Sequence, residues 1–260
     1  MTPDYTSFLH AAREACLLAG EFLREHFHAV KQVDEALLHD IKLRLDKECQ
    51  ELITLHLLAA FPHTAVLGEE GNAGAGESEY LWVVDPIDGT VNYFYGIPIF
   101  CVSIAMQHRG ELVLGCVYDP MQRECFTAIA GQQPMLNGRP VSVSARTQMQ
   151  DAIVFIGHGT HDGSGEQGIR RFAHISRQVR KIRILGSAAL TLCYIAAGRF
   201  DAYVEGRISL WDFAAARVIL EAAGGCLQFE PVDAAGIKGS IIAWNGRIPL
   251  LKALEMDTCS

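Results

Sequence analysis

The sequence predicts an α/β fold in which layers of helix and sheet alternate. Two amphipathic helical patterns open the chain, short strands and tight turns fill its middle, and helical and strand patterns then follow one another toward its end. Half of the 260 residues are hydrophobic, so the chain is able to bury a sizeable core. This composition excludes a disordered tail and a collagen-like repeat.

Two helices are expected at the start of the chain. Apolar residues three or four positions apart over residues 4–30 predict a helix that lies on a core, and the same spacing predicts a helix from about 46 to 61, which Pro62 ends. Strands are expected at 65–67 and 80–84. Between these strands the glycines of GNAGAGES indicate a mobile loop.

The middle of the chain, residues 100–130, is predicted to form an antiparallel sheet. Three runs of β-branched and aromatic residues are separated by the turn sequences HRGE and PMQR, and the Asn-Gly of MLNGRP marks another tight turn. Strands and helices then alternate, with Gly198 and Gly224 closing two of the helices. The expected elements are strand 152–157, helix 167–180, strand 181–185, helix 187–198, strand 200–205, helix 211–225 and strand 225–230.

We expect two closely joined halves in one compact unit. Residues 1–145 form an N-terminal α+β half that carries most of the candidate metal ligands, and residues 146–260 form a C-terminal α/β half. No Pro/Ser-rich linker separates them, so the boundary is soft and falls near residues 140–150.

The charge balance and the cysteines indicate the partners and the compartment. The 22 Lys and Arg and 30 Asp and Glu give a net charge of −8, which argues against a nucleic-acid partner. The eight cysteines lack any C-x-x-C pair and are interpreted as small buried hydrophobes in a reducing compartment. Neither a signal peptide nor a membrane-spanning run is visible, so we expect a cytoplasmic protein with no membrane partner.

The sequence VVDPIDGT, residues 83–90, carries the strongest chemical signal. An apolar strand ends in two carboxylates, Asp85 and Asp88, and a Gly-Thr pair, Gly89 and Thr90, opens the next segment. Clustered carboxylates repel one another unless a cation neutralises them, and oxygen ligands of this kind suit Mg²⁺. The backbone N–H groups from Thr90 onward are predicted to form an anion site that holds a phosphate.

Two further acidic elements fit the same site. The sequence Gly68-Glu69-Glu70 ends the preceding predicted strand, and Asp212 opens a long apolar helix. Each has a simpler interpretation when it is taken alone. Glu69 and Glu70 are then loop charges, and Asp212 is then a helix N-cap.

These pieces resemble the inositol monophosphatase family, the lithium-sensitive, Mg²⁺-dependent phosphatases. The matching segments occur in family order: LGEE at 67–70, DPIDGT at 85–90, LGSAALTLCYIAAGRFDAYVE at 185–205 and WDFAAARVILEAAGG at 211–225. The resemblance covers most of the chain. It implies a layered α/β/α/β/α sandwich of the inositol monophosphatase/fructose-1,6-bisphosphatase type, an enzyme that hydrolyses phosphomonoesters, and a homodimer.

The resemblance also implies the metal ligands. Glu69, Asp85 and the carbonyl of Ile87 match the ligands of a first Mg²⁺, whereas Asp85, Asp88 and Asp212 match those of a second. Asp85 then bridges the two ions, and two or three Mg²⁺ act in each active site. Glu69 is also assigned to the catalytic group.

The remaining catalytic and substrate-side residues follow from the same resemblance. Thr90 matches a residue that orients the attacking water together with an aspartate, here Asp46. The alignment around DIKLRLD departs from the family pattern, so the role of Asp40 stays open between site residue and surface charge. The residues matched to substrate binding are Gly89, Thr90, Gly186, Ser187, Ala188 and Glu205.

The resemblance implies that the substrate is a small phosphorylated metabolite, for which myo-inositol monophosphate is the leading expectation because of the DGTVNY and DAYVE segments. Sugar bisphosphates such as fructose 1,6-bisphosphate, histidinol phosphate and 3′-phosphonucleotides are the alternatives within the family. An alternative of another class is a metal-binding regulatory module that has lost catalysis. It is disfavoured because every matched side-chain metal ligand is still a carboxylate.

Overall fold

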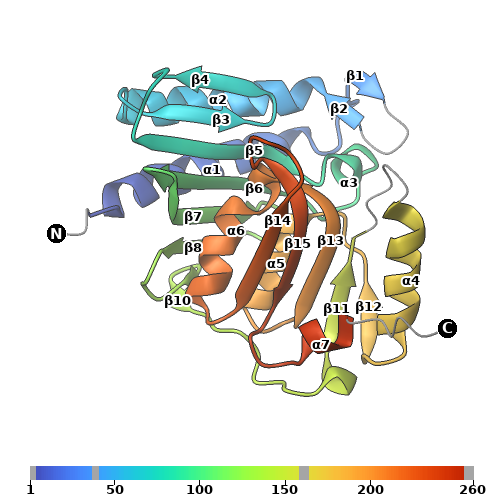
Figure 1. Ribbon diagram of the computed structural model, residues 1–260. Coiled ribbons are helices and arrows are strands. Elements are labelled where there is room, and N and C mark those ends of the chain that lie inside the picture. Colours follow the sequence, from blue (N-terminus) through green and yellow to red (C-terminus); the bar gives the residue numbers. More distant parts are fainter. Residues whose placement is uncertain (1–3, 37–40, 158–163, 255–260) are drawn as a thin grey trace.

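The computed structural model describes residues 4–36, 41–157 and 164–254, and these residues form five layers of helix and sheet (Figure 1). Helices α1 and α2 pack on one face of a large sheet, α5 and α6 fill the space between its other face and a smaller sheet, and α4 and α7 cover the far face of the smaller sheet. The predicted α/β fold class is therefore confirmed. The helices are α1 (Thr6–His26), α2 (Arg44–Ala60), α3 (Thr90–Phe94), α4 (Ser164–Ser176), α5 (Ala188–Ala196), α6 (Leu210–Ala222) and α7 (Leu250–Leu254), with a 3₁₀ turn at Met149–Asp151.

The large sheet has eight strands in the order β10-β9-β8-β7-β6-β5-β3-β4. Its neighbours are antiparallel except for β3 and β5, which run parallel. Strand β4 turns back along the outer edge of β3, and the chain then passes β3 to enter β5. The Asn-Gly turn between β9 and β10 has positive φ at both Asn137 and Gly138, as the sequence predicts. The strands are β3 (Ala65–Gly68), β4 (Gly71–Gly74), β5 (Tyr80–Asp88), β6 (Cys101–His108), β7 (Glu111–Asp119), β8 (Glu124–Ile129), β9 (Met135–Leu136) and β10 (Arg139–Pro140).

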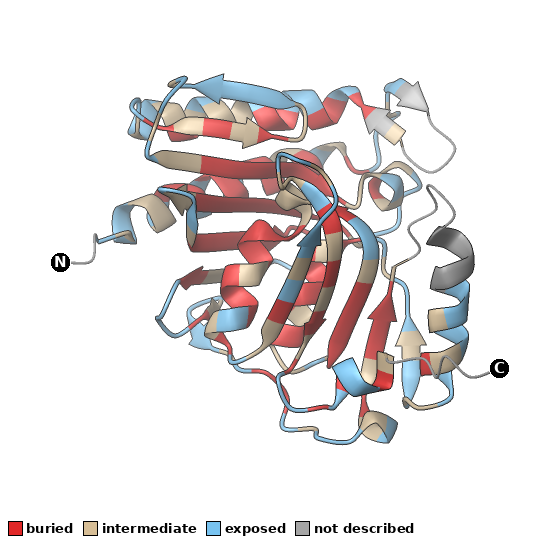
Figure 2. Ribbon diagram, in the orientation of Figure 1, coloured by how far each residue is buried: buried red, intermediate tan, exposed pale blue. Residues whose placement is uncertain are grey.

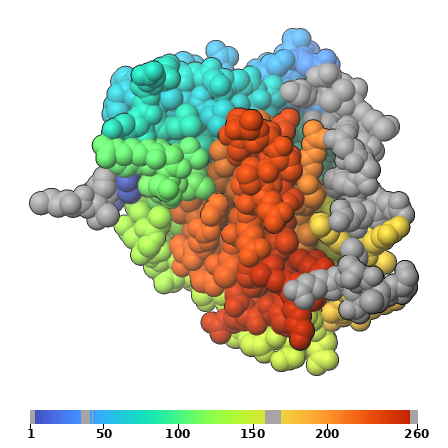
Figure 3. Space-filling model, in the orientation of Figure 1, coloured from blue at the N-terminus to red at the C-terminus, as the bar shows by residue number. Residues whose placement is uncertain are grey.

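The smaller sheet has five strands in the order β12-β11-β13-β15-β14. Strand β11 runs parallel to both β12 and β13, and β15 pairs antiparallel with β13 and β14. In Figure 3 the segments near the C-terminus, drawn orange to red, lie against the N-terminal half. The strands are β11 (Ile153–Ile156), β12 (Lys181–Arg183), β13 (Ala202–Ser209), β14 (Cys226–Pro231) and β15 (Lys238–Trp244); β1 (Val33–Ala36) and β2 (Ile41–Leu43) form a separate pair.

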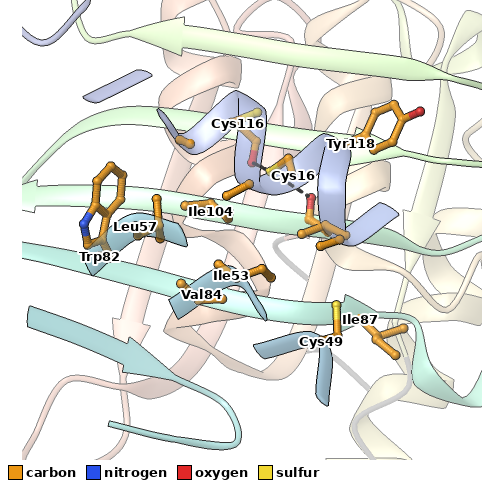
Figure 4. Packing of buried hydrophobic residues seen from close by; sticks show 14 of the residues in the cluster. Cys16, Cys49, Ile53, Leu57, Trp82, Val84, Ile87, Ile104, Cys116 and Tyr118 are labelled. Carbon is orange, nitrogen blue, oxygen red and sulfur yellow. Dashed lines mark hydrogen bonds between the residues drawn. The ribbon is translucent and has the colours of Figure 1, made fainter. Parts of the chain in front are cut away.

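The central strands of the large sheet, β5 to β7, are buried on both faces because helices cover each face, whereas the edge strands β4 and β10 are exposed (Figure 2). Side chains alternate along β5: Val84 points to the layer of α1 and α2, whereas Val83 points to the layer of α5 and α6. Figure 4 shows Val84 together with Ile53 and Leu57 of α2. Six of the seven described cysteines are buried and none is in a disulfide, as expected for small hydrophobes.

The structure corrects the sequence prediction at one segment and extends it at another. The glycine-rich segment predicted as a mobile loop contains β4, an edge strand paired with β3. Backbone hydrogen bonds hold this strand and need no side chains, so its glycines do not prevent it. The sequence pattern also missed β15, which lies between β13 and β14.

The boundary near residues 140–150 stays a prediction. Within the described residues, no helix is both long and apolar enough to cross a membrane.

Gly115 tests how closely the layers pack. A Cβ on this residue of β7 would lie 2.1 Å from the backbone oxygen of Ala215 in α6. Since neither backbone is free to retreat, we expect Gly115→Ala to reduce the free energy of unfolding by about 1–3 kcal/mol. Urea denaturation measures this loss. Gly76→Ala is the matched control because its Cβ would meet nothing within 4 Å; equal effects of the two variants would contradict the close contact.

Candidate active site

The end of β5 brings both aspartates of the DPIDGT motif to one face of the sheet. In a regular strand, residues three apart point to opposite faces. Here Asp85 pairs with Ser103 and Asp88 pairs with Cys101, so three steps along β5 oppose two along β6. The extra residue is a β-bulge at Pro86 and Ile87, and it turns Asp88 toward the layer of α5 and α6.

Asp88 joins the large sheet to the start of α5. Its carboxylate accepts hydrogen bonds from Ser187 Oγ at 2.5 Å and from the N–H groups of Ala188 and Ala189 at 3.0 and 2.8 Å. The Cys101 thiol donates to the same carboxylate at 3.4 Å. Burial raises the pKa of Asp88, although these four bonds act to lower it. Ser187 and Ala188, predicted on the substrate side, therefore contact a predicted metal ligand.

Asp85 is the most enclosed carboxylate of the site. It is 1% exposed and accepts a hydrogen bond from the Ile87 N–H at 3.0 Å. Its pKa is raised well above 3.8, first by burial and then by the negative charges of Glu69, Asp88, Asp212 and Asp46. The structure thus brings together all the acidic residues that the sequence assigns to metal binding and catalysis.

Asp46 and Asp212 occupy equivalent positions on two helices. Each lies at the third residue of its helix, where the carboxylate accepts a hydrogen bond from the N-cap N–H: Asp46 from Leu43 at 2.7 Å, and Asp212 from Ser209 at 2.8 Å. Asp212 is therefore not the N-cap itself, which is Ser209, but the acidic partner of Ser209 in a capping box. This capping role is compatible with a role in the site, because the charges of both carboxylates also raise the pKa of Asp85.

Thr90 contacts the aspartate with which it was predicted to act. Thr90 Oγ1 lies 3.3 Å from Asp46 Oδ1 and 2.9 Å from the Ile87 carbonyl oxygen. The hydroxyl has one proton, so these two oxygens are alternative acceptors. Gly89 precedes it with φ 100°, a left-handed conformation that a glycine adopts without strain. Asp40 lies outside the described residues.

The turn that carries Glu69 is held from α2 by Gln50, a residue that the sequence pattern did not reveal. Gln50 Oε1 accepts a hydrogen bond from the Glu70 N–H at 2.9 Å, and its Nε2 donates to the Gly71 carbonyl at 2.9 Å. The approach needs a glycine at position 68, where a Cβ would lie 2.2 Å from the amide. No spacing or charge rule marks a buried glutamine on an amphipathic helix, so only the tertiary contact shows its role.

Asn92 fixes the predicted substrate-side segment next to α3. Its Nδ2 donates to the carbonyls of Leu185 at 2.7 Å and Ile99 at 2.8 Å. Gly186 follows with φ 75°. Asn92 lies in the DGTVNY segment, but an asparagine by itself does not indicate that it will bind these two carbonyl groups.

The side chains of the site that could bind a metal ion are carboxylates, which offer oxygen ligands. Within the described residues, no three His, Cys, Asp or Glu side chains are gathered closely enough to hold one metal ion. The hydrogen bonds above explain this spread, because Asp46, Asp88 and Asp212 each turn an oxygen to a backbone N–H. A buried carboxylate whose pKa is raised by four other carboxylates nevertheless fits a hard cation, which removes that repulsion.

Comparisons with known proteins agree with this chemistry. The model of the inositol monophosphatase family matches residues 4–244. The chain is 38% identical over 86% of its length to inositol monophosphatase 1 of Solanum lycopersicum, covering 84% of that protein. It is 34% identical to a fructose-1,6-bisphosphatase/inositol-1-monophosphatase of Thermotoga maritima, covering 88% of each chain. The solved structure of extragenic suppressor protein suhB from Bartonella henselae superposes with a TM-score of 0.89 at 31% identity, covering 97% of this chain and 100% of that one.

Gln50→Leu tests the support of Glu69. The variant leaves the Glu70 N–H and the Gly71 carbonyl without their side-chain partner, so we expect a loss of about 1–3 kcal/mol in the free energy of unfolding. Urea denaturation measures the loss. Glu51→Leu, at the next and exposed position of α2, is the control and should change little. A loss of similar size in both variants would rule out a specific contribution of the amide.

Asp85→Asn should stabilise the metal-free protein near neutral pH. Because burial and the neighbouring carboxylates raise the pKa of Asp85 in the folded state, the wild type loses stability as the pH rises above the ordinary value of 3.8, and the loss is complete once the pH exceeds the raised value. We therefore expect a higher free energy of unfolding for the variant than for the wild type, measured with a chelator present. The gain should shrink as the pH falls and vanish below the ordinary value of 3.8, where the wild-type carboxyl is protonated in both states. A gain that does not depend on pH would contradict the charge repulsion.

Proposed function

The chain belongs to the inositol monophosphatase family of phosphatases, and from this premise we propose that it hydrolyses myo-inositol monophosphate to inositol and inorganic phosphate. The observation that supports the reaction best is the set of carboxylates around Asp85, beside the Thr90 hydroxyl and Asp46. This set suits cations that hold a phosphate. The family is metal-dependent, and Mg²⁺ is the ion that we propose.

The acidic residues divide into two ligand groups. Glu69, Asp85 and the carbonyl of Ile87 would hold one Mg²⁺, and Asp85, Asp88 and Asp212 would hold a second, with Asp85 common to both. Bound Mg²⁺ supplies a lowered pKa for the attacking water and neutralises charge on the phosphate. Lithium sensitivity is expected from the same family resemblance.

The chain's own residues orient the water and the substrate. When Thr90 donates a hydrogen bond to Asp46 Oδ1, the lone pairs of Thr90 Oγ1 are left to accept a hydrogen bond from the attacking water and so orient it. The Leu43 N–H and burial keep Asp46 in place for that bond. Glu69 completes the catalytic group. The substrate side is formed by Gly89 and Thr90 at the start of α3, by Gly186, Ser187 and Ala188, and by Glu205.

The experiment is a panel of phosphomonoesters assayed for released phosphate with Mg²⁺. We expect myo-inositol monophosphate to give the highest kcat/KM, and Asp85→Asn to lose more than about tenfold in kcat, or about 1.4 kcal/mol. A higher kcat/KM for fructose 1,6-bisphosphate, histidinol phosphate or a 3′-phosphonucleotide would replace the proposed substrate. Mg²⁺ binding without hydrolysis of any ester would favour the regulatory module instead.

A double-mutant cycle tests Thr90 and Asp46 as one unit. If the two orient the same water, Thr90→Ala and Asp46→Asn should each depress kcat, and the double variant should be scarcely slower than the worse single variant. Steady-state kinetics with saturating Mg²⁺ measures all four forms. Losses that simply add would mean that Asp46 acts elsewhere, and Asp40 would become the next candidate.

We also propose that two copies of the chain form a homodimer through the surface beside α3. Tyr95, Ile97 and Ile184 are 69%, 42% and 64% exposed. Contact of these apolar side chains with water is unfavourable, and a partner surface would remove it. The bond from Asn92 to Leu185 ties the segment of Ile184 to α3. Sedimentation or light scattering should give a dimer mass for the wild type and a monomer mass for Ile184→Asp. A monomeric wild type would contradict the proposal.

A further inference from the structure

The middle of β13, where the strand shifts register, holds the carboxylate of Glu205 in one orientation. Glu205 Oε1 accepts hydrogen bonds from the N–H groups of Gly206 at 2.8 Å and Arg207 at 3.4 Å. Tyr203 donates its hydroxyl to Oε2 at 3.3 Å. The pairing of β13 with β15 shifts register just after Glu205, which leaves these N–H groups pointing at the side chain instead of along the ladder.

Tyr203 connects Glu205 to the candidate active site. The ring is buried, and its pKa is raised first by burial and then by the negative charges of Glu205, Asp88 and Asp212. The hydroxyl therefore stays protonated and serves as a donor at neutral pH. Tyr203 also packs in the buried cluster that contains Cys101, whose thiol donates to Asp88, so the side chain that binds Glu205 lies in the layer that borders the acidic cluster.

The carboxylate of Glu205 occupies the space where residue 157 has no side chain. A Cβ on Gly157 would lie 1.3 Å from Glu205 Oε2 and 2.3 Å from its Cδ. The Gly157 N–H donates to the Val204 carbonyl at 2.8 Å, and β11 pairs with β13 up to Ile156 and Val204. The backbone of Gly157 is thus fixed beside β13, so a side chain there displaces the carboxylate and not the strand.

We propose that Gly157 is a specificity-determining positioning residue, which allows Glu205 to face the hydroxyl groups of a polyol phosphate. The inference rests on the proposed function, because it concerns the substrate side of that same site. A hydrogen bond to a charged acceptor is stronger than one between neutral groups, so the orientation of this carboxylate bears directly on the affinity for a polyol.

Gly157→Ala tests the inference with two substrates. For myo-inositol monophosphate we expect KM to rise about tenfold, equivalent to about 1.4 kcal/mol. For p-nitrophenyl phosphate, which offers no hydroxyl groups to Glu205, the rise should be much smaller. Gly76→Ala makes the same chemical change where a Cβ meets nothing within 4 Å, and should alter neither KM. Equal effects of Gly157→Ala on the two substrates would overturn the inference.

The Glu205→Ala background separates positioning from a general loss of structure. If Gly157 acts through Glu205, adding Gly157→Ala to Glu205→Ala should raise KM no further and should not lower the melting temperature, because the displaced carboxylate is gone. The same comparison serves if Gly157→Ala alone folds poorly, since Glu205→Ala should then restore the fold. Additive effects on KM or melting temperature would overturn the inference.

The two proposals fail in different ways. A wild-type protein that hydrolyses p-nitrophenyl phosphate but no polyol phosphate would overturn the proposed substrate and this inference with it. A wild type that hydrolyses myo-inositol monophosphate, with Gly157→Ala kinetically equal to Gly76→Ala, would overturn this inference alone.

Discussion

The N-termini of helices α2, α5 and α6 and the end of strand β5 converge near the buried carboxylate of Asp85. The position of the site depends on this convergence. Asp46 caps α2, Asp212 caps α6, and Asp88 accepts the first N–H groups of α5. The positive ends of the helix dipoles offset part of the repulsion among these acids. The offset is incomplete, since burial and the neighbouring carboxylates keep the pKa of Asp85 raised, and a bound cation would relieve the remaining repulsion.

The same hydrogen bonds join the two halves of the chain. Asp88 belongs to the large sheet, yet its partners Ser187, Ala188 and Ala189 belong to the segment that opens α5. Asn92 repeats the connection by binding the Leu185 carbonyl. Candidate metal ligands and substrate-side residues are therefore held in one arrangement, as a reaction between a bound phosphate and an oriented water requires.

Three glycines allow neighbouring elements or side chains to come into close contact. Gly115 lets α6 lie against β7, Gly68 admits the amide of Gln50 beside the Glu69 turn, and Gly157 admits the carboxylate of Glu205. The first contact sets the spacing of the layers, whereas the other two set the orientation of a charged side chain. An added methyl group would collide with the Ala215 backbone at position 115, with the Gln50 side chain at position 68 and with the Glu205 side chain at position 157. The stability of the fold and the geometry of the site therefore depend on the same kind of close contact.

Periodicity and motif spacing in the sequence determined the layered α/β class, most helices and strands, and the acidic residues Glu69, Asp85, Asp88 and Asp212, whereas Asp46 was predicted from the family resemblance. These features depend on local pattern: apolar side chains recur at helical or strand spacing, and DPIDGT lies in one short segment. Strand β15, the pairing of β4, and the roles of Gln50, Asn92 and Gly157 were decided only by tertiary structure. Each of these depends on a partner far away in the chain, such as Glu205 for Gly157, and neither a glycine nor a buried amide shows in the sequence which distant group will approach it.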